Sequence, residues 1–430
     1  MNHEVLRKII LEQHQLIKDM KIIPRTEDIS EENNRIIVGI RRSGKTTMLY
    51  HLVKNLIKKG VLWNQIIYIN FEDERLDGFS PKDLDDILAV KEEMSEKEGW
   101  FFFDEIQNIP LWEKFCRRMA DSKQHVFITG SNARMLSREM ESSLGGRYLS
   151  TLIFPYSFKE LLCAKNIAHD KDALLLNSST ALITKAFDEY LHFGGFPENI
   201  DKKNKREYIS AVYSKVLEGD IITRHEIRNP MLLRLMIKKI AESLKDTISY
   251  NRLTATMKTI GINTNVQTVI DYVSYAEDAY LLFPVRNWFS AFTEKESVKK
   301  HYFIDTGILS LFLIDKDPLL LENTVAVELY KQHPIDFDEK VFFVKSAKTG
   351  LDIDFYLPQE QTLIQVAYSL DSNSREREVN GLIKAKRLIN DVKRFIILTS
   401  NEKETIDMGN MKIEVIPVYQ WALSLNKRVQ

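Results

Sequence analysis

A G-x-x-x-x-G-K-T pattern occupies residues 39–46 and reads GIRRSGKT. It follows a short apolar segment, Arg35–Ile40, that predicts a β-strand, and it precedes Thr46–Lys59, whose apolar residues recur at helical spacing until Gly60 ends the helix. Glycines permit the positive φ angles by which successive backbone N–H groups curl around an anion, and the helix N-terminus adds positive potential. The chain is therefore predicted to contain a strand–loop–helix unit that binds phosphate.

Two side chains of this pattern match the needs of a nucleoside triphosphate and its metal ion. Lys45 can neutralise charge on the β- and γ-phosphates, and the hydroxyl of Thr46 can ligate Mg²⁺. Arg41 and Arg42 are extra cations in the loop, which either bind phosphate or remain solvated. We expect ATP and Mg²⁺ as cofactors, held by Gly39, Arg42, Ser43, Gly44, Lys45, Thr46 and Thr47.

Two carboxylates follow a strongly apolar segment, Trp100–Phe103, which we expect to be a buried β-strand. Asp104 at the strand tip can hold Mg²⁺ through water, and Glu105 can polarise the water that attacks the γ-phosphate. An ordinary solvated strand end would also carry two acids, but their pairing with the lysine loop favours a nucleotide site. One further strand, Gln65–Phe71, separates the two motif strands in the chain and implies an extra strand between them in the sheet.

Polar residues near two later strands are candidates for a catalytic role. The strand His125–Thr129 leads to Asn132, our first candidate to orient the attacking water, and to Ser131, the second; a plain turn is the alternative. Arg147 lies in a glycine-rich loop before the strand Leu149–Phe154. It would either stabilise the transition state in a neighbouring subunit or close the loop at the surface. We thus expect Glu105, Asn132 and Arg147 as catalytic residues, with Thr46 and Asp104 as metal ligands.

Composition limits the classes of protein to which the chain can belong. The 60 Lys and Arg nearly balance the 61 Asp and Glu, for a formal charge of −1, which excludes a uniformly basic nucleic-acid coat. Two cysteines, Cys116 and Cys163, are too few for a disulfide scaffold or a four-cysteine zinc module. No apolar run approaches the ~18 residues that span a bilayer. We expect a cytoplasmic protein with no membrane segment.

The order of these patterns divides the chain into three parts. Residues 1–160 alternate short apolar runs with helical patterns, which is typical of a parallel sheet built from βαβ units. Residues 161–298 are mainly helical, with a break at Phe193–Pro197, where two glycines precede a proline. Residues 299–430 return to short strands around a long charged helix, Ser374–Ile389. The expected strands of this last part are Tyr302–Ile304, Val341–Val344, Ile353–Leu357, Leu363–Val366 and Phe395–Leu398.

The middle part contains a segment, Ile248–Val285, that resembles a winged helix. Residues 231–265 carry six Lys or Arg against two Asp or Glu, a local surplus that could follow phosphates. Thr259–Val285, which would include the recognition helix, has no Lys or Arg and carries three acids. DNA is therefore one partner that this segment could bind, and the alternative is a module that packs or binds protein.

Acidic residues of the C-terminal part resemble the metal site of restriction-endonuclease-like folds. Glu322 and Glu328 lie on a helix, and Asp354 lies in a strand. The Glu-x-Lys pair that such nucleases need on the next strand is here Gln365-Val366-Ala367, which lacks the second charge and the general base. We expect a nuclease-like fold without cleavage. A lysine from a neighbouring strand could replace the missing one, and the candidates are Lys345 and Lys348.

Five segments together resemble a known family. They read GIRRSGKTT, FFFDEIQNIP, FITGSNARML, GGRYLSTLIFPYSF and FGGFPE, and the resemblance covers nearly the whole chain. The chain is similar to the AAA+ superfamily ATPases of archaea and bacteria that carry a C-terminal domain of unknown function. The resemblance implies an α/β P-loop NTPase sheet of the AAA+ type, followed by a helical and winged-helix region and a smaller nuclease-like α/β domain.

Together the motifs and the resemblance predict Mg²⁺-dependent ATP binding and hydrolysis. We expect hydrolysis to drive a conformational switch on an unidentified partner. One alternative is an ATP-regulated DNA-binding or nuclease-related protein with a degenerate nuclease site, and another is a non-enzymatic scaffold that holds nucleotide for stability only. A homo-oligomer would suit an arginine supplied in trans.

Overall fold

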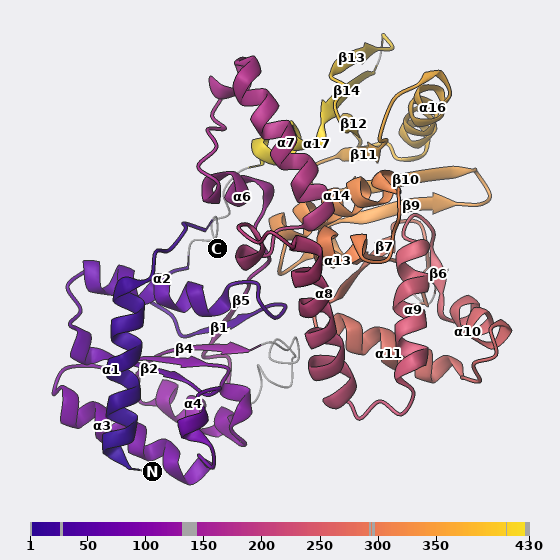
Figure 1. The fold of residues 1–430 in the computed structure, drawn as a ribbon. Helices are drawn as coiled ribbons and strands as arrows, with labels where there is room; N and C mark the ends of the chain where they lie inside the picture. The colour runs from indigo at the N-terminus through magenta and orange to yellow at the C-terminus, as the bar shows by residue number, and fades with distance from the viewer. Residues whose placement is uncertain are drawn as a thin grey trace. The chain divides into compact units, whose positions relative to one another are not determined.

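The computed structural model describes residues 2–25, 29–130, 144–291, 294, 297–409 and 411–425. The chain forms two compact units and passes from the first to the second between Phe154 and Pro155 (Figure 1). In place of the expected second and third domains, the residues after Pro155 make one unit. No helix in the part of the chain that the structure describes is long and apolar enough to cross a membrane.

The first unit contains a five-stranded parallel sheet in the order β2–β3–β4–β1–β5. Every strand predicted for this region is present. The extra strand between the two motif strands is also confirmed, but it is β4, whereas β2 lies at the edge of the sheet. The strands are β1 (Arg35–Val38), β2 (Ile66–Asn70), β3 (Trp100–Asp104), β4 (His125–Gly130) and β5 (Leu149–Leu152).

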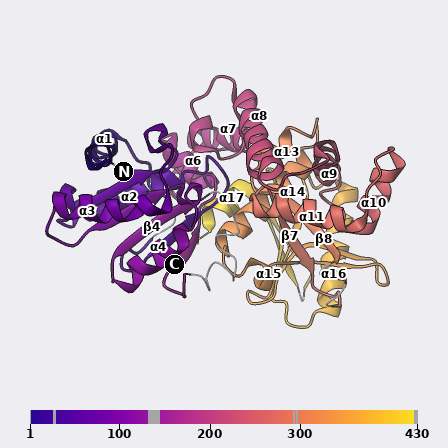
Figure 2. The ribbon, with the colours of Figure 1, turned by 90° about the horizontal axis from the view of Figure 1, so that it is seen from below.

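Helices cover both faces of this sheet because its central strands are apolar on both sides. Phe102 packs in the core beneath α1 and α2, whereas Phe103 points the other way and meets Phe115 of α4, with ring centroids 6.1 Å apart. Figure 2 shows α1 and α4 on opposite sides of β4. The helices of this unit are α1 (His3–Asp19), α2 (Lys45–Lys58), α3 (Leu84–Met94) and α4 (Trp112–Asp121).

The second unit contains a mixed sheet of nine strands in the order β13–β14–β12–β11–β10–β9–β7–β8–β6. The expected domain boundary at residue 298 falls between β7 and β8, which pair antiparallel with each other, so the two expected domains share this sheet. All five strands predicted for the C-terminal part are found. The strands are β6 (Ile248–Ser249), β7 (Leu282–Asn287), β8 (Val298–Phe303), β9 (Phe342–Ser346), β10 (Leu351–Leu357), β11 (Thr362–Val366), β12 (Arg394–Thr399), β13 (Glu404–Asp407) and β14 (Lys412–Pro417).

One helix of the second unit, α14, is buried on all sides over Leu320–Leu329. Its interior therefore includes polar side chains, and these need partners in the core. The helices of this unit are α6 (Phe158–Ala164), α7 (Asn177–Phe193), α8 (Lys205–Lys215), α9 (Pro230–Glu242), α10 (Tyr250–Thr259), α11 (Val266–Asp278), α13 (Thr306–Ser310), α14 (Asp317–Gln332), α15 (Phe337–Lys340), α16 (Ser372–Leu388) and α17 (Val418–Ser424).

The paired glycines that were expected to break the helical region do so at the end of α7. Gly194 has φ 68°, and a Cβ placed there would lie 1.9 Å from Asp305 Oδ1. The backbone N–H of Gly195 donates to Asp305 Oδ2 at 2.7 Å. Burial raises the pKa of Asp305 to about 6, although backbone N–H groups stabilise its charged form. This motif therefore fastens the end of α7 to the start of α13.

Candidate active site

The phosphate loop connects β1 to α2 through backbone conformations that glycine favours. Gly39 has φ 146° and Gly44 has φ 102°, and Arg42 between them has φ 66°. A Cβ on Gly39 would lie 2.1 Å from the carbonyl oxygen of Ile153, so no larger residue fits there. Gly44 offers no side chain to cap α2, and the first-turn N–H groups have no intrahelical acceptors by helix geometry. The loop thus presents donors to an anion.

Asp104 lies at the tip of β3 and is almost completely buried. Its carboxylate accepts hydrogen bonds from the hydroxyls of Thr46 at 2.7 Å and Tyr68 at 3.0 Å, and also from Thr129. Burial raises the pKa of Asp104 above its ordinary value, and these hydroxyl donors counteract part of the rise. The two predicted metal ligands, Thr46 and Asp104, are thereby brought into direct contact.

Lys45 and Glu105 face each other beside this pair. The Nζ atom of Lys45 lies 3.9 Å from Glu105 Oε1 and donates to the carbonyl oxygens of Gly39 at 3.1 Å and Ile40 at 3.4 Å. Glu105 has φ 53°, and its backbone N–H donates to Thr129 Oγ1 at 2.9 Å. The other carboxylate oxygen of Glu105 accepts from Gln107. A cation and a carboxylate are therefore both held at the phosphate loop.

A nucleoside triphosphate with a divalent ion fits these residues. Ser43 is fully buried in the loop, and within the described residues its Oγ has no hydrogen-bond partner. Among the described residues, two carbonyl oxygens and one carboxylate lie around the Lys45 ammonium group, and a phosphate oxygen would be a further acceptor for its three N–H donors. The oxygen donors of Thr46 and Asp104 are those that Mg²⁺ prefers.

The structure brings most of the predicted site residues together, but not all of them. Those that meet at the carboxyl ends of β1 and β3, or in the first turn of α2, are Gly39, Arg42, Ser43, Gly44, Lys45, Thr46, Thr47, Asp104 and Glu105. Arg42 is exposed, whereas Lys45 is buried. Asn132 and Ser131 lie outside the described residues.

Arg147 is placed at the opposite edge of the same sheet. It precedes Leu149, which pairs with Arg35 at the start of β1, whereas the phosphate loop follows the end of β1. Its guanidinium contacts Asp121 and donates to the carbonyl of Gly145 at 3.1 Å. Arg147 therefore does not reach the loop of its own chain, and its role toward a neighbouring chain stays a prediction.

Three residues that hold the acids in place were not predicted from the sequence. Tyr68 and Thr129 bind Asp104 from the strands on either side of β3, and Gln107 binds Glu105. A signal was present for two of them, because Tyr68 and Thr129 are hydroxyl-bearing residues inside otherwise apolar strands. Their hydroxyls must find partners when the strands are buried.

In the second unit, two of the acids expected at a nuclease-like site meet one lysine. Glu322 on α14 and Asp354 on β10 both contact Lys300 on β8. Glu328 belongs to another buried group with Tyr190 and Lys331. The two lysines proposed as replacements do not enter this cluster: Lys345 pairs with Asp352 at 3.1 Å, and Lys348 lies in an exposed turn.

A family model described as an AAA domain matches residues 31–162, and a model described as a domain of unknown function (DUF8612) matches residues 184–318. An uncharacterized protein of Methanocaldococcus jannaschii is 33% identical, with 98% of this chain and 95% of the relative covered. The chain belongs to the AAA+ superfamily ATPases that carry a C-terminal domain of unknown function.

This AAA+ protein is also 27% identical to an uncharacterized protein of Haemophilus influenzae, over 90% of this chain and 94% of that one. Among solved structures it is similar to the Walker-type ATPase of Pyrococcus abyssi, with 14% identity and a TM-score of 0.43 over 69% of this chain and 100% of the other. The family implies nucleotide binding, and the residues that match the AAA model include the phosphate loop and the acids of β3.

Proposed function

We propose that the first unit of this AAA+ protein binds ATP with Mg²⁺ and hydrolyses it. The observation that carries the proposal is the convergence of four side chains from two motifs that lie about 60 residues apart in the sequence. Thr46 contacts Asp104 at 2.7 Å, and Lys45 lies 3.9 Å from Glu105.

Each of the four side chains has a definite task in this proposal. Lys45 binds the β- and γ-phosphates, and Thr46 with Asp104 holds Mg²⁺, which when bound offsets the charge of the phosphate oxygens. Glu105 polarises the attacking water, and Gln107 together with the backbone contact to Thr129 keeps its carboxylate oriented. The buried, hydroxyl-lined setting of Asp104 fixes the metal ligand before nucleotide arrives.

Hydrolysis would drive a conformational switch on a partner through Ile153, which directly follows β5. The Cα of Gly39 packs so closely on the carbonyl of Ile153 that a Cβ there would lie 2.1 Å from it, so a shift of the loop would displace Ile153. Ile153 is two residues before Pro155, where the second unit begins in the sequence. The packing contact between Gly39 and Ile153 thus connects the phosphate loop to the segment that leads into the second unit.

The proposed activity is tested by ATP turnover of the purified chain, with Mg²⁺ or with EDTA, at several protein concentrations. We expect turnover that requires Mg²⁺, because the triphosphate otherwise lacks its charge-neutralising ion. If Arg147 acts on a neighbouring subunit, the rate per chain rises with protein concentration. A chain that releases no phosphate with Mg²⁺ at any concentration would contradict hydrolysis.

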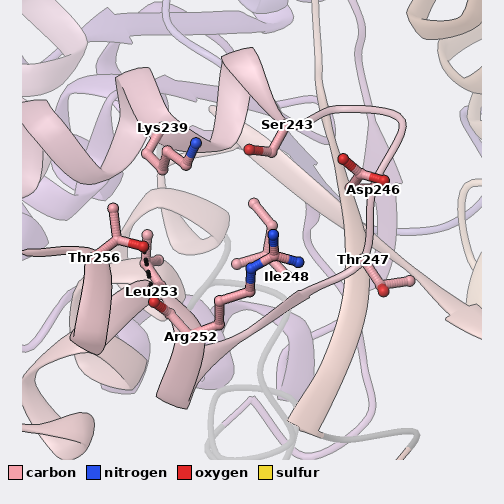
Figure 3. A pocket seen from close by; sticks show the side chains of 8 residues that line it. All are labelled: Lys239, Ser243, Asp246, Thr247, Ile248, Arg252, Leu253 and Thr256. Atoms are coloured by element: carbon pink, nitrogen blue, oxygen red, sulfur yellow. Dashed lines mark hydrogen bonds between the residues drawn. The ribbon is translucent and has the colours of Figure 1, made fainter.

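DNA binding is the second candidate function, because a basic pocket lies between α9 and α10 of the second unit. Lys239, Ser243 and Arg252 surround one small hollow (Figure 3). Within the described residues, neither Lys239 nor Arg252 has an acidic partner. The succession α9–β6–α10–α11–β7–β8, with β8 paired to both β6 and β7, supports interpreting this region as a winged helix.

The pocket lies beside α10 and not on α11, the helix expected to read bases. Since α11 has no Lys or Arg, we propose that this region contacts the phosphate backbone and does not read sequence. Two cations and a hydroxyl suit a phosphodiester oxygen. The other side chains that line the pocket are Asp246, Thr247, Ile248, Leu253 and Thr256.

Replacing both Lys239 and Arg252 by alanine should weaken binding to duplex DNA and lower its salt dependence. Two lost phosphate contacts reduce the slope of log K against log salt by about 2. The measurement is fluorescence anisotropy of a labelled duplex at several salt concentrations. The matched control replaces Lys384 and Arg387, two exposed cations on α16, and changes the net charge equally. Equal slopes for the two double variants would assign the binding to charge in general and reject the pocket.

A further inference from the structure

A lysine is completely enclosed in the second unit between two carboxylates. Lys300 on β8 is 1% exposed, and its Nζ lies 3.2 Å from Glu322 Oε1 and 3.4 Å from Asp354 Oδ1. Glu322 on α14 is 0% exposed. Three elements that are distant in the sequence therefore direct their charged side chains to one point.

Further donors hold the two carboxylates around this ammonium group. Tyr302 donates its hydroxyl to Glu322 Oε1 at 2.8 Å, and the backbone N–H of Val366 donates to Asp354 Oδ2 at 2.9 Å. The second oxygen of Glu322 is buried and has no hydrogen-bond partner among the described residues. One ammonium group thus faces two carboxyl groups, and one buried oxygen of Glu322 is left without a partner among the described residues.

This arrangement has the geometry of a cation site. A buried carboxylate is stable only when it is paired or bound to a metal, and here buried Glu322 and partly buried Asp354 share one cation. Burial alone would lower the pKa of Lys300, but Glu322 and Asp354 raise it, so the ammonium stays charged. The unpartnered oxygen of Glu322 could accept a further bond from a cation, in addition to the contact that its other oxygen makes with Lys300.

The surrounding residues explain why an ammonium suits this site better than a metal. Gln365 is neutral, and both ends of its amide already have partners. Its Oε1 accepts from the backbone N–H of Asp354 at 2.8 Å, and its Nε2 donates to Glu378 at 2.7 Å. Nowhere in the described ranges do three or more His, Cys, Asp or Glu side chains form a group that could hold a metal. The ammonium of Lys300, 3.2 Å from Glu322 and 3.4 Å from Asp354, occupies the position between the two carboxylates that a divalent ion would need.

We propose that Glu322 and Asp354 form a cation site whose resident cation is the ammonium of Lys300, and that the site accepts a divalent ion only when this ammonium is removed. In the native chain the cluster then joins β8, α14 and β10 and takes no part in metal-dependent chemistry. This inference is independent of nucleotide hydrolysis by the first unit.

The test is Mn²⁺ binding to the nucleotide-free full chain, followed by electron paramagnetic resonance of the free ion. Lys300→Ala should bind one Mn²⁺ on the order of 100-fold more tightly than wild type binds it at this position, because Mn²⁺ then supplies the counter-charge that Glu322 and Asp354 have lost. Adding Glu322→Gln to Lys300→Ala should remove the gained site. Lys345→Ala is the matched control, since Lys345 pairs with the exposed Asp352, and it should gain nothing.

Two results would overturn the proposal. One is a Mn²⁺ site in the wild-type chain that Glu322→Gln or Asp354→Asn abolishes. The other is a folded Lys300→Ala chain that binds Mn²⁺ no better than wild type. If Lys300→Ala does not fold, Lys300→Gln keeps a donor between the carboxylates without the charge; Mn²⁺ should raise its melting temperature and leave that of wild type unchanged. Equal responses of these two chains would reject the site.

Discussion

Replacing Lys45 by alanine should abolish measurable ATP binding. The ammonium group is buried at the loop, where it lies within 3.4 Å of two carbonyl oxygens and 3.9 Å from Glu105. Each charge-assisted hydrogen bond to phosphate contributes about 1.5–3 kcal/mol, so the loss of two weakens binding by at least ~100-fold. Isothermal titration calorimetry with ATP and Mg²⁺ measures the change directly.

The control for this substitution is Lys58→Ala at the other end of α2. Lys58 is exposed in the last turn, so its removal changes the charge of the same helix without touching the loop. Both variants should unfold thermally within a few degrees of wild type, since neither removes apolar packing. Undiminished ATP binding by a folded Lys45→Ala chain would show that the loop does not bind phosphate as proposed.

The part of this site that could be predicted from the sequence is the part encoded locally. Strands such as Trp100–Asp104 can be predicted from their consecutive apolar residues. A glycine-rich loop between a strand and a helix has few alternative structures. The carboxyl ends of parallel strands lie at one edge of a sheet, so Asp104 and Lys45 could be expected to meet without knowledge of the intervening chain.

The partners that arrive from distant strands could not be predicted in the same way. Lys300 is an example: the sequence suggested Lys345 or Lys348, as lysines that a neighbouring strand could supply. The lysine that reaches Asp354 comes from β8, which is brought near β10 only through the sheet order β10–β9–β7–β8. A sheet order of this kind depends on long-range pairing and leaves no local pattern. The shared sheet also removed the domain boundary expected at residue 298.

Replacing Glu105 by glutamine should leave ATP binding within a few-fold of wild type and lower turnover by on the order of 100- to 10,000-fold, the range that a general base contributes. Glutamine has the same shape and tolerates the φ of 53° as well as glutamate does, so the loop and its backbone contact to Thr129 should persist. What is lost is the negative oxygen that faces the loop 3.9 Å from Lys45. Single-turnover hydrolysis with Mg²⁺ and ATP separates this loss from any effect on binding.

Glu92→Gln provides the matched control, because Glu92 is exposed on α3 and the same atom exchange there should leave both binding and turnover unchanged. The pair of variants also distinguishes the two roles of the acids. If Glu105 served only to hold Lys45 in place, Glu105→Gln would weaken ATP binding and turnover together. If it polarises the attacking water, the variant retains bound ATP and does not release phosphate. Hydrolysis by Glu105→Gln at the wild-type rate would assign that step to another residue.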